Sequence, residues 1–228
     1  MKTFEQLIRG NQSLMQKVID FDKANDKLLV LDFTASNAEL TDEILNDTDL
    51  FSTWVNQKLE AVGARYGIGG YNEHRTIYSR SEHFNAAEEP RRLHLGVDIW
   101  APALTPIYNF YDAKVHSFAN NNNFGDYGAT IILTYEIDGY KFNALYGHLS
   151  LASLDGLKEG NLIPGGTCFA TLGVKGENGF WPPHLHFQLI QNMEGLKGDY
   201  PGVCKFSERA KYLANCPNPN LILNCSLT

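Results

Sequence analysis

The chain has 228 residues, 43% of them hydrophobic and 12% aromatic, which suits one packed domain with a small appendage and excludes a disordered protein. Its formal net charge of −7 argues against nucleic acid as a partner. The chain contains neither an N-terminal apolar run typical of a secretory signal nor one of about 20 residues that could span a bilayer. We therefore expect no membrane span, and a cytoplasmic protein as the chain stands, or a periplasmic or extracellular one if a leader was removed.

Residues 1–65 predict a small α-rich N-terminal section. Apolar residues recur at helical spacing from Phe4 to Ile19, and Lys27–Phe33 is typical of a short strand. A second helix is predicted over Asp49–Ala61, with Gly63 ending it.

Residues 66–192 change to short alternating runs separated by Gly, Pro and Asn. Strands are predicted at Leu95–Ile99, Ile107–Phe118, Ala129–Ile137, Tyr140–His148 and His184–Ile190. Asp138-Gly139 is a strong signal for a two-residue hairpin. This pattern predicts a mainly β fold with an antiparallel sandwich or barrel-like core. Residues 193–228 are expected to be a tail that packs on this core, with a short helix near Ser207–Ala214.

The first candidate site segment alternates strictly from His94 to Ile99. On a strand, Leu95, Val97 and Ile99 would share one side, and His94, Gly96 and Asp98 the other. Because Gly96 has no side chain, a metal ion could lie over the gap between the imidazole and the carboxylate. A simple hydrogen-bonded pair explains His94 and Asp98 equally well.

The second segment places His184 and His186 two residues apart on the polar side of an apolar strand. Two charged imidazoles so close would repel each other, so a shared metal or a shared catalytic role is the better interpretation. A third segment adds His148, which by the same alternation shares a side with Tyr146 and Ser150.

Counting these groups indicates the kind of site. Four histidines and one aspartate can supply two imidazoles and one carboxylate to a metal and leave two histidines for proton transfer. Zinc suits this set and non-haem iron remains possible, but the two extra histidines favour hydrolysis over oxygen chemistry.

Three motifs in this order resemble the lysostaphin/LytM-type zinc metallopeptidases: His94-x-x-x-Asp98, Gly147-His148-Leu149-Ser150 and His184-x-His186. The resemblance implies an antiparallel β core of the duplicated hybrid-motif type. It implies Zn²⁺ on His94, Asp98 and His186, with His148 and His184 as catalytic histidines. It further implies a substrate of peptide or peptidoglycan fragments, cleaved at a peptide bond. Family members often carry a tyrosine that holds the oxyanion, for which Tyr71 and Tyr78 are candidates.

Two alternatives remain open. A non-catalytic zinc-containing binding or regulatory module would leave His148 and His184 without a purpose. A sugar-phosphotransfer carrier would have no need of the His94 and Asp98 pair.

Arginines and cysteines add weaker expectations. We interpret Arg75, Arg80, Arg91 and Arg92 as solvated surface charge, unless one of them binds a substrate carboxylate. The four cysteines form no Cys-x-x-Cys pair and are interpreted as buried free thiols, with disulfides in the tail as the alternative.

Overall fold

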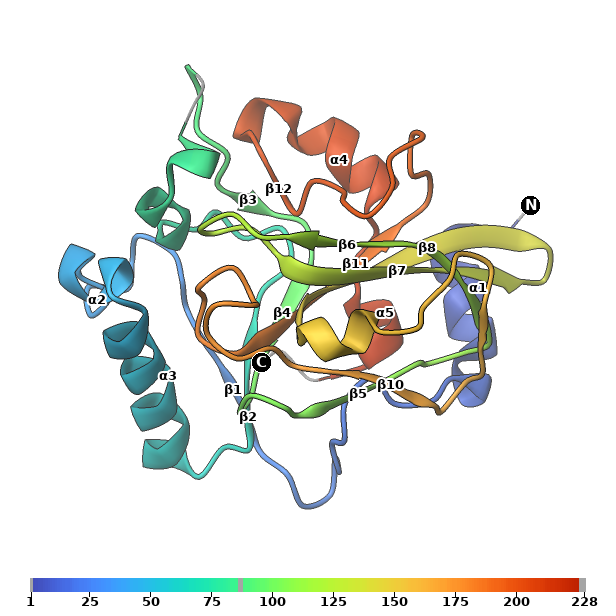
Figure 1. The fold of residues 1–228 in the computed structure, drawn as a ribbon, viewed down its shortest axis with the longest axis horizontal. Helices are drawn as coiled ribbons and strands as arrows, with labels where there is room; N and C mark the ends of the chain where they lie inside the picture. The colour runs from blue at the N-terminus through green and yellow to red at the C-terminus, as the bar shows by residue number, and fades with distance from the viewer. Residues whose placement is uncertain (1, 86–87, 226–228) are drawn as a thin grey trace.

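The computed structural model describes residues 2–85 and 88–225 (Figure 1). Within these residues a sheet of eight strands has the order β1-β2-β4-β11-β8-β7-β6-β9. Its strands are β1 Leu28–Val30, β2 Tyr66–Gly69, β4 Val97–Trp100, β6 Ala113–Asn121, β7 Gly128–Ile137, β8 Tyr140–Leu149, β9 Leu162–Ile163 and β11 His184–Ile190. β1 and β2 run parallel, and the remaining neighbours in the sheet run antiparallel. The mainly β prediction is confirmed.

The β7–β8 hairpin forms the centre of this sheet. Ile137 pairs with Tyr140, and the two residues between them, Asp138 and Gly139, both have positive φ (50° and 77°). Such a turn twists in the same sense as the strands, which is why Asp-Gly favours it. The predicted hairpin is confirmed.

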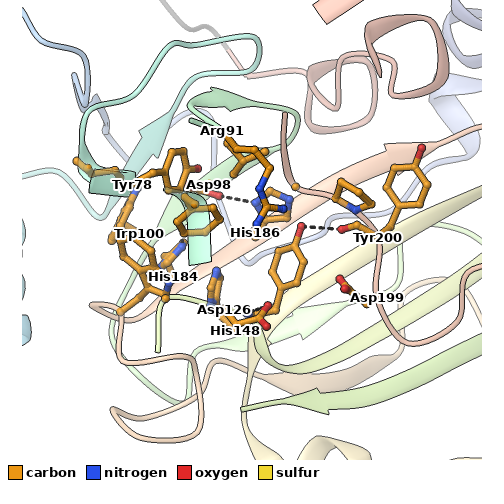
Figure 2. Close-up of a pocket in the computed structure, with 18 residues that line it drawn as sticks. Tyr78, Arg91, Asp98, Trp100, Asp126, His148, His184, His186, Asp199 and Tyr200 are labelled. Atoms are coloured by element: carbon orange, nitrogen blue, oxygen red, sulfur yellow. Dashed lines mark hydrogen bonds and ion pairs between the residues drawn. The ribbon is translucent and has the colours of Figure 1, made fainter. Parts of the chain in front are cut away.

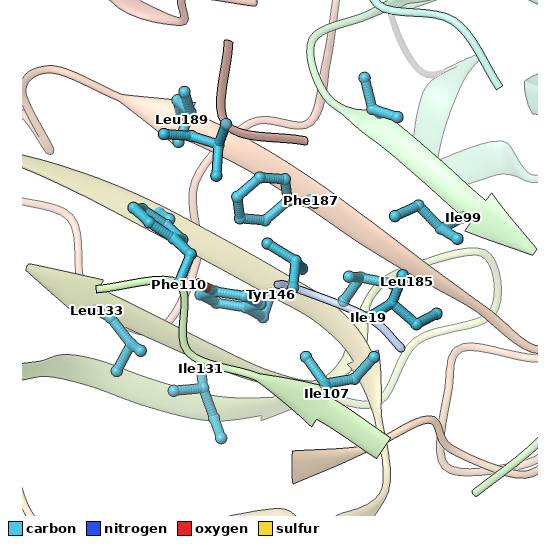
Figure 3. Close-up of a cluster of buried hydrophobic side chains, with 14 of the residues drawn as sticks. Ile19, Ile99, Ile107, Phe110, Ile131, Leu133, Tyr146, Leu185, Phe187 and Leu189 are labelled. Carbon is cyan, nitrogen blue, oxygen red and sulfur yellow. The ribbon is translucent and has the colours of Figure 1, made fainter. Parts of the chain in front are cut away.

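The two faces of the sheet differ in chemistry along β11. Leu185, Phe187 and Leu189 point into the largest apolar cluster, together with Tyr146 of β8 (Figure 3). His184, His186 and Gln188 alternate with them and therefore lie on the opposite face. The candidate site is thus on the face of the sheet that faces away from the main core.

The N-terminal section contributes helices α1 Phe4–Asn11, α2 Asp42–Asn46 and α3 Thr48–Val62, which lie around the sheet (Figure 1). The Asp47 side chain caps the start of α3, and Gly63 ends it in the left-handed conformation, as the sequence predicts. Buried residues of α1 join the main core, whereas those of α3 pack in a second cluster beside Trp100. The division of the chain at residues 65 and 192 stays a prediction.

The predicted helical run to Ile19 is wrong beyond Asn11. After a short turn at Gln12–Leu14 the chain becomes extended, and Ile19 forms a bridge with Ile107. Here the backbone bonds to the segment around strand β5, since Tyr108 donates to the carbonyl of Val18 at 2.8 Å. Tertiary pairing therefore overrides the helical spacing of the apolar residues.

Two predicted strands have different bounds in the structure. Ile107–Phe118 becomes β5 Pro106–Tyr108 and β6, and β5 pairs with β10 Cys168–Thr171 in a separate sheet. Of the predicted strand Leu95–Ile99, only Val97–Ile99 is a strand, as part of β4. Leu93–His94 forms a separate short strand, β3, which pairs with β12 Val203–Cys204. The break at Leu95-Gly96 sends Leu95 into a different apolar cluster from Val97 and Ile99. The prediction that these three share one side is therefore wrong.

The tail packs on the core through β12, the helix α4 Arg209–Asn215 and the short helix α5 Asn220–Leu223. All four cysteines are free thiols; Cys204 and Cys216 are buried as expected, but Cys168 is exposed. In the described ranges, the structure contains no helix with the length and apolarity needed to cross a membrane.

Candidate metal centre

The three predicted metal ligands come from three strands and lie close together. His186 of β11 lies opposite Asp98 of β4, and His94 ends β3 just before β4. The distance from His186 Nδ1 to Asp98 Oδ1 is 3.0 Å, from His94 Nε2 to Asp98 Oδ1 3.2 Å, and from His94 Nε2 to His186 Nδ1 3.0 Å. We call these three facing atoms the donor triangle. Figure 2 shows two of the three residues, Asp98 and His186.

The outer nitrogens of the two imidazoles fix which atoms face the donor triangle. His94 Nδ1 lies 2.9 Å from the carbonyl of Gly70, which can only accept, so the proton is on Nδ1. His186 Nε2 lies 2.9 Å from Oε1 of Gln188, whose amide nitrogen donates to the carbonyl of Pro201. That second bond sets the amide orientation, so His186 Nε2 carries the proton. Both neutral imidazoles therefore point a lone pair into the donor triangle.

This geometry fits a metal ion. Three lone pairs that face each other at 3.0–3.2 Å without a shared proton repel one another unless a cation lies among them. Zinc with ligand bonds of about 2.0–2.1 Å places tetrahedral ligands about 3.3 Å apart, close to the observed separations. Imidazole and carboxylate also suit iron, so the donor set alone leaves the metal open.

The charge states also favour a cation. Burial lowers the pKa of His94 to about 4, which keeps this ligand neutral at ordinary pH. Burial alone would raise the pKa of Asp98, but the neighbouring His94 and Arg75 hold it well below the usual value, so Asp98 stays ionised. Neutral imidazoles and an ionised carboxylate are the forms that bind metal.

Gly96 has a different role from the one expected. A Cβ atom built on Gly96 would lie 2.6 Å from Cε1 and 2.7 Å from Nε2 of His186. The space left by the absent side chain therefore holds the His186 ring rather than the ion. Glycine is therefore required at position 96, but because it makes room for a metal ligand, His186, and not for the ion itself.

His148 reaches the same face by an unexpected route. Tyr146 points into the main core, where its hydroxyl bonds Tyr135, so the predicted alternation that groups His148 with Tyr146 is wrong. His148 has φ +61°, a conformation that costs a non-glycine residue about 1–2 kcal/mol and reverses the expected side-chain direction. This local strain brings His148 to the site.

His148 and His184 lie side by side, with ring centroids 4.1 Å apart. His148 Nδ1 donates to the carbonyl of Asn178 at 2.9 Å and His184 Nδ1 to that of Pro182 at 2.7 Å. Each ring therefore keeps an unprotonated Nε2, and that of His184 lies 4.0 Å from Asp98 Oδ2. Burial lowers the pKa of both rings, to about 4 for His184.

A pocket opens over these groups (Figure 2). Its walls include Tyr78, Trp100 and Tyr127; Trp100 stacks on His184 with centroids 4.0 Å apart. The five predicted site residues are each no more than 5% exposed. Of the two candidate tyrosines, Tyr78 lines the pocket, whereas Tyr71 donates to the carbonyl of Cys216.

The arginines differ from the solvated surface charge that was expected. Arg75 is fully buried and pairs with Asp98 and Glu73, so that interpretation is wrong for Arg75. Arg80 is half-buried against aromatic rings, and burial lowers its pKa to about 10. Arg91 lines the pocket.

Sequence reasoning missed several residues that support the ligands. Gln188 could have been found, because it follows His186 by two residues on the same face of the strand. Gly70 and Arg75 carry no such local signal, since each lies more than 20 residues from the ligand that it contacts.

Part of the chain matches a known protein family. Residues 92–197 match the family model described as Peptidase family M23. A comparison with curated proteins found no match. The matched segment is thus similar to peptidase family M23, which confirms the resemblance to lysostaphin/LytM-type enzymes.

Solved structures similar to this chain have the following names and overlaps. The catalytic domain of the antimicrobial peptidase lysostaphin from Staphylococcus simulans is 22% identical, with 76% of this chain and 98% of that chain covered and a TM-score of 0.44. A zinc containing peptidase from Vibrio cholerae is 26% identical, with 43% and 27% covered and a TM-score of 0.34. A protein from Pseudomonas aeruginosa described as a peptidase M23 is 20% identical, with 60% and 47% covered and a TM-score of 0.38. The chain thus spans less than half the length of the last two.

Proposed function

We propose that the chain is a zinc-dependent metalloendopeptidase that hydrolyses a peptide bond, with peptidoglycan-like peptides as its substrate class. One observation carries the proposal: three metal-donor atoms face one another at 3.0–3.2 Å, with two unprotonated imidazole nitrogens beside them. The match of residues 92–197 to the model of a peptidase family supports it. The peptidoglycan class follows from the resemblance to lysostaphin/LytM-type enzymes.

In this proposal His94, Asp98 and His186 hold Zn²⁺. When bound, the ion polarises a carbonyl group and lowers the pKa of a coordinated water toward about 7. Hydrogen bonds on the outer nitrogens keep both imidazoles in the tautomer that binds metal. The chain thus offers two neutral ligands and one anionic ligand, a set typical of catalytic zinc with its fourth position open.

His148 and His184 handle protons. Each has its Nδ1 proton engaged with a backbone carbonyl, so Nε2 is free to accept a proton. One of them accepts the proton of the attacking water, and the other assists the oxyanion or the leaving amine. Tyr78 is the better tyrosine for the oxyanion, because it lines the pocket, whereas the hydroxyl of Tyr71 donates to the carbonyl of Cys216.

Metal content and hydrolysis, measured together, test this proposal. Purified protein is expected to contain zinc and to cleave members of a panel of peptidoglycan fragments and glycine-rich peptides, with cleavage stopped by a chelator. His94→Ala and Asp98→Ala should lose the metal. His148→Ala should retain it and lose turnover by about 10²–10⁴-fold. Full zinc content in folded His94→Ala would refute the ligand assignment.

The second candidate is a zinc-containing binding or regulatory module without catalysis. The near-complete burial of all five site side chains favours testing it, because little of their surface is accessible to a substrate. This candidate predicts bound zinc but no cleavage of any peptide in the panel, and unchanged metal content in His148→Ala.

A further inference from the structure

Arg75 is a fully buried cation beside the donor triangle. A buried charge is strongly unfavourable unless it is paired and its donors are satisfied. Nε of Arg75 donates to Glu73 Oε2 at 2.6 Å, and Nη1 donates to Asp98 Oδ2 and to the hydroxyl of Tyr78, the latter at 3.2 Å. Nη2 lies 3.4 Å from the carbonyl of Gly70. All three guanidinium nitrogens are therefore bonded.

These contacts reach two of the three ligands. Asp98 offers Oδ1 to the two histidines, while Oδ2 is occupied by Arg75. The carbonyl of Gly70, which Arg75 also contacts, is the acceptor that fixes the tautomer of His94. A Cβ built on Gly69 would lie 2.5 Å from Nη2 of Arg75, so the backbone is also shaped around the guanidinium.

We propose that Arg75 is a positioning residue for the metal centre: it holds Asp98 so that Oδ1 alone binds the ion, and it steadies the carbonyl that orients His94. This inference rests on the proposed function. Arginine suits the task because its planar fork reaches several acceptors in fixed directions, which the single ammonium of lysine cannot do.

The sign of the change in metal affinity separates positioning from a purely electrostatic effect. If a cation near the site were removed, electrostatics alone would make the site bind Zn²⁺ more tightly. Loss of a residue that orients ligands typically weakens metal binding by about 10–100-fold. Arg75→Met removes the charge and the fork but keeps most of the side-chain length, so the two effects predict opposite results.

The experiment measures zinc affinity by competition with a chromophoric chelator, and the Co²⁺ absorption spectrum of each variant. We expect Arg75→Met to bind zinc about 10–100-fold more weakly and to show an altered Co²⁺ spectrum, with Arg75→Lys between it and the wild type. Arg65→Met is the matched control, since Arg65 also pairs with two carboxylates, Asp20 and Asp26, at the surface. Unchanged or tighter zinc binding in folded Arg75→Met would overturn the inference.

A second measurement requires no variant. A crystal structure of the zinc-loaded wild type should show Asp98 bound through Oδ1 alone, with Oδ2 on Arg75. Coordination through both oxygens would overturn the inference even if Arg75→Met fails to fold. If the wild type binds no metal, both the proposed function and this inference fail. If the wild type binds zinc and Arg75→Met binds it equally well, only this inference fails and the proposed function stands.

Discussion

The space above Gly96 gives a sharp test of the site geometry. In Gly96→Ala the new methyl group would lie 2.6 Å from Cε1 of His186, where ordinary contact begins at 3.4 Å. The ring must therefore move by about 0.8 Å, roughly four times the tolerance of about 0.2 Å expected for a metal–ligand distance. The backbone gives little relief, because the carbonyl of Phe187 is only 2.9 Å away and β11 is paired on both sides.

We expect Gly96→Ala to bind zinc about 10–100-fold more weakly and to lose about 1–3 kcal/mol of stability by overpacking. The assay is chelator competition combined with thermal unfolding and circular dichroism of the same sample. Gly10→Ala is the control, because nothing lies within 4 Å of a Cβ on that helical glycine. Wild-type zinc affinity in folded Gly96→Ala would refute the reasoning.

Three further predictions follow from the groups around the donor triangle. Gln188→Leu removes the acceptor for His186 and should weaken zinc binding by about 10–100-fold; equal affinity in a chelator titration would contradict this. Tyr78→Phe should lower turnover by about 10²–10³-fold while zinc content stays the same, and steady-state kinetics showing no loss would exclude Tyr78 from oxyanion binding. Burial lowers the pKa of His94 and His184 to about 4, so between that value and 6.5 the unfolded chain binds more protons than the folded one. Metal-free protein should therefore lose stability as the pH falls through this window, by up to about 1.4 kcal/mol per pH unit for each histidine, and denaturant unfolding that is flat over it would be the contrary result.

Local signals predicted the parts of the fold that depend on neighbouring residues. The Asp138-Gly139 turn and the end of α3 at Gly63 follow from backbone conformations that few residues tolerate. The alternation through Ile107–Phe118 concealed a break, because Phe110 stays buried while the chain passes from one sheet to another. Strand β2 gave no usable pattern, since it is buried on both faces and half of its residues are glycine.

In the candidate site, too, the sequence predicted what depends on neighbouring residues and not what depends on distant ones. His184 and His186, two residues apart on one strand, could be assigned to one face directly from the sequence. His148 was expected at the site for the wrong reason, because its left-handed backbone cannot be inferred from strand alternation. Arg75 was interpreted as surface charge, because its partner Asp98 is 23 residues away and only the folded sheet brings them together.

Metal stoichiometry tests the central claim most directly. Elemental analysis of the purified chain and of His94→Ala, Asp98→Ala and His186→Ala should find one zinc ion per wild-type chain and little or none in each variant, while His148→Ala keeps the ion. A wild-type chain that binds no divalent metal, or full occupancy in all three folded ligand variants, would contradict the account.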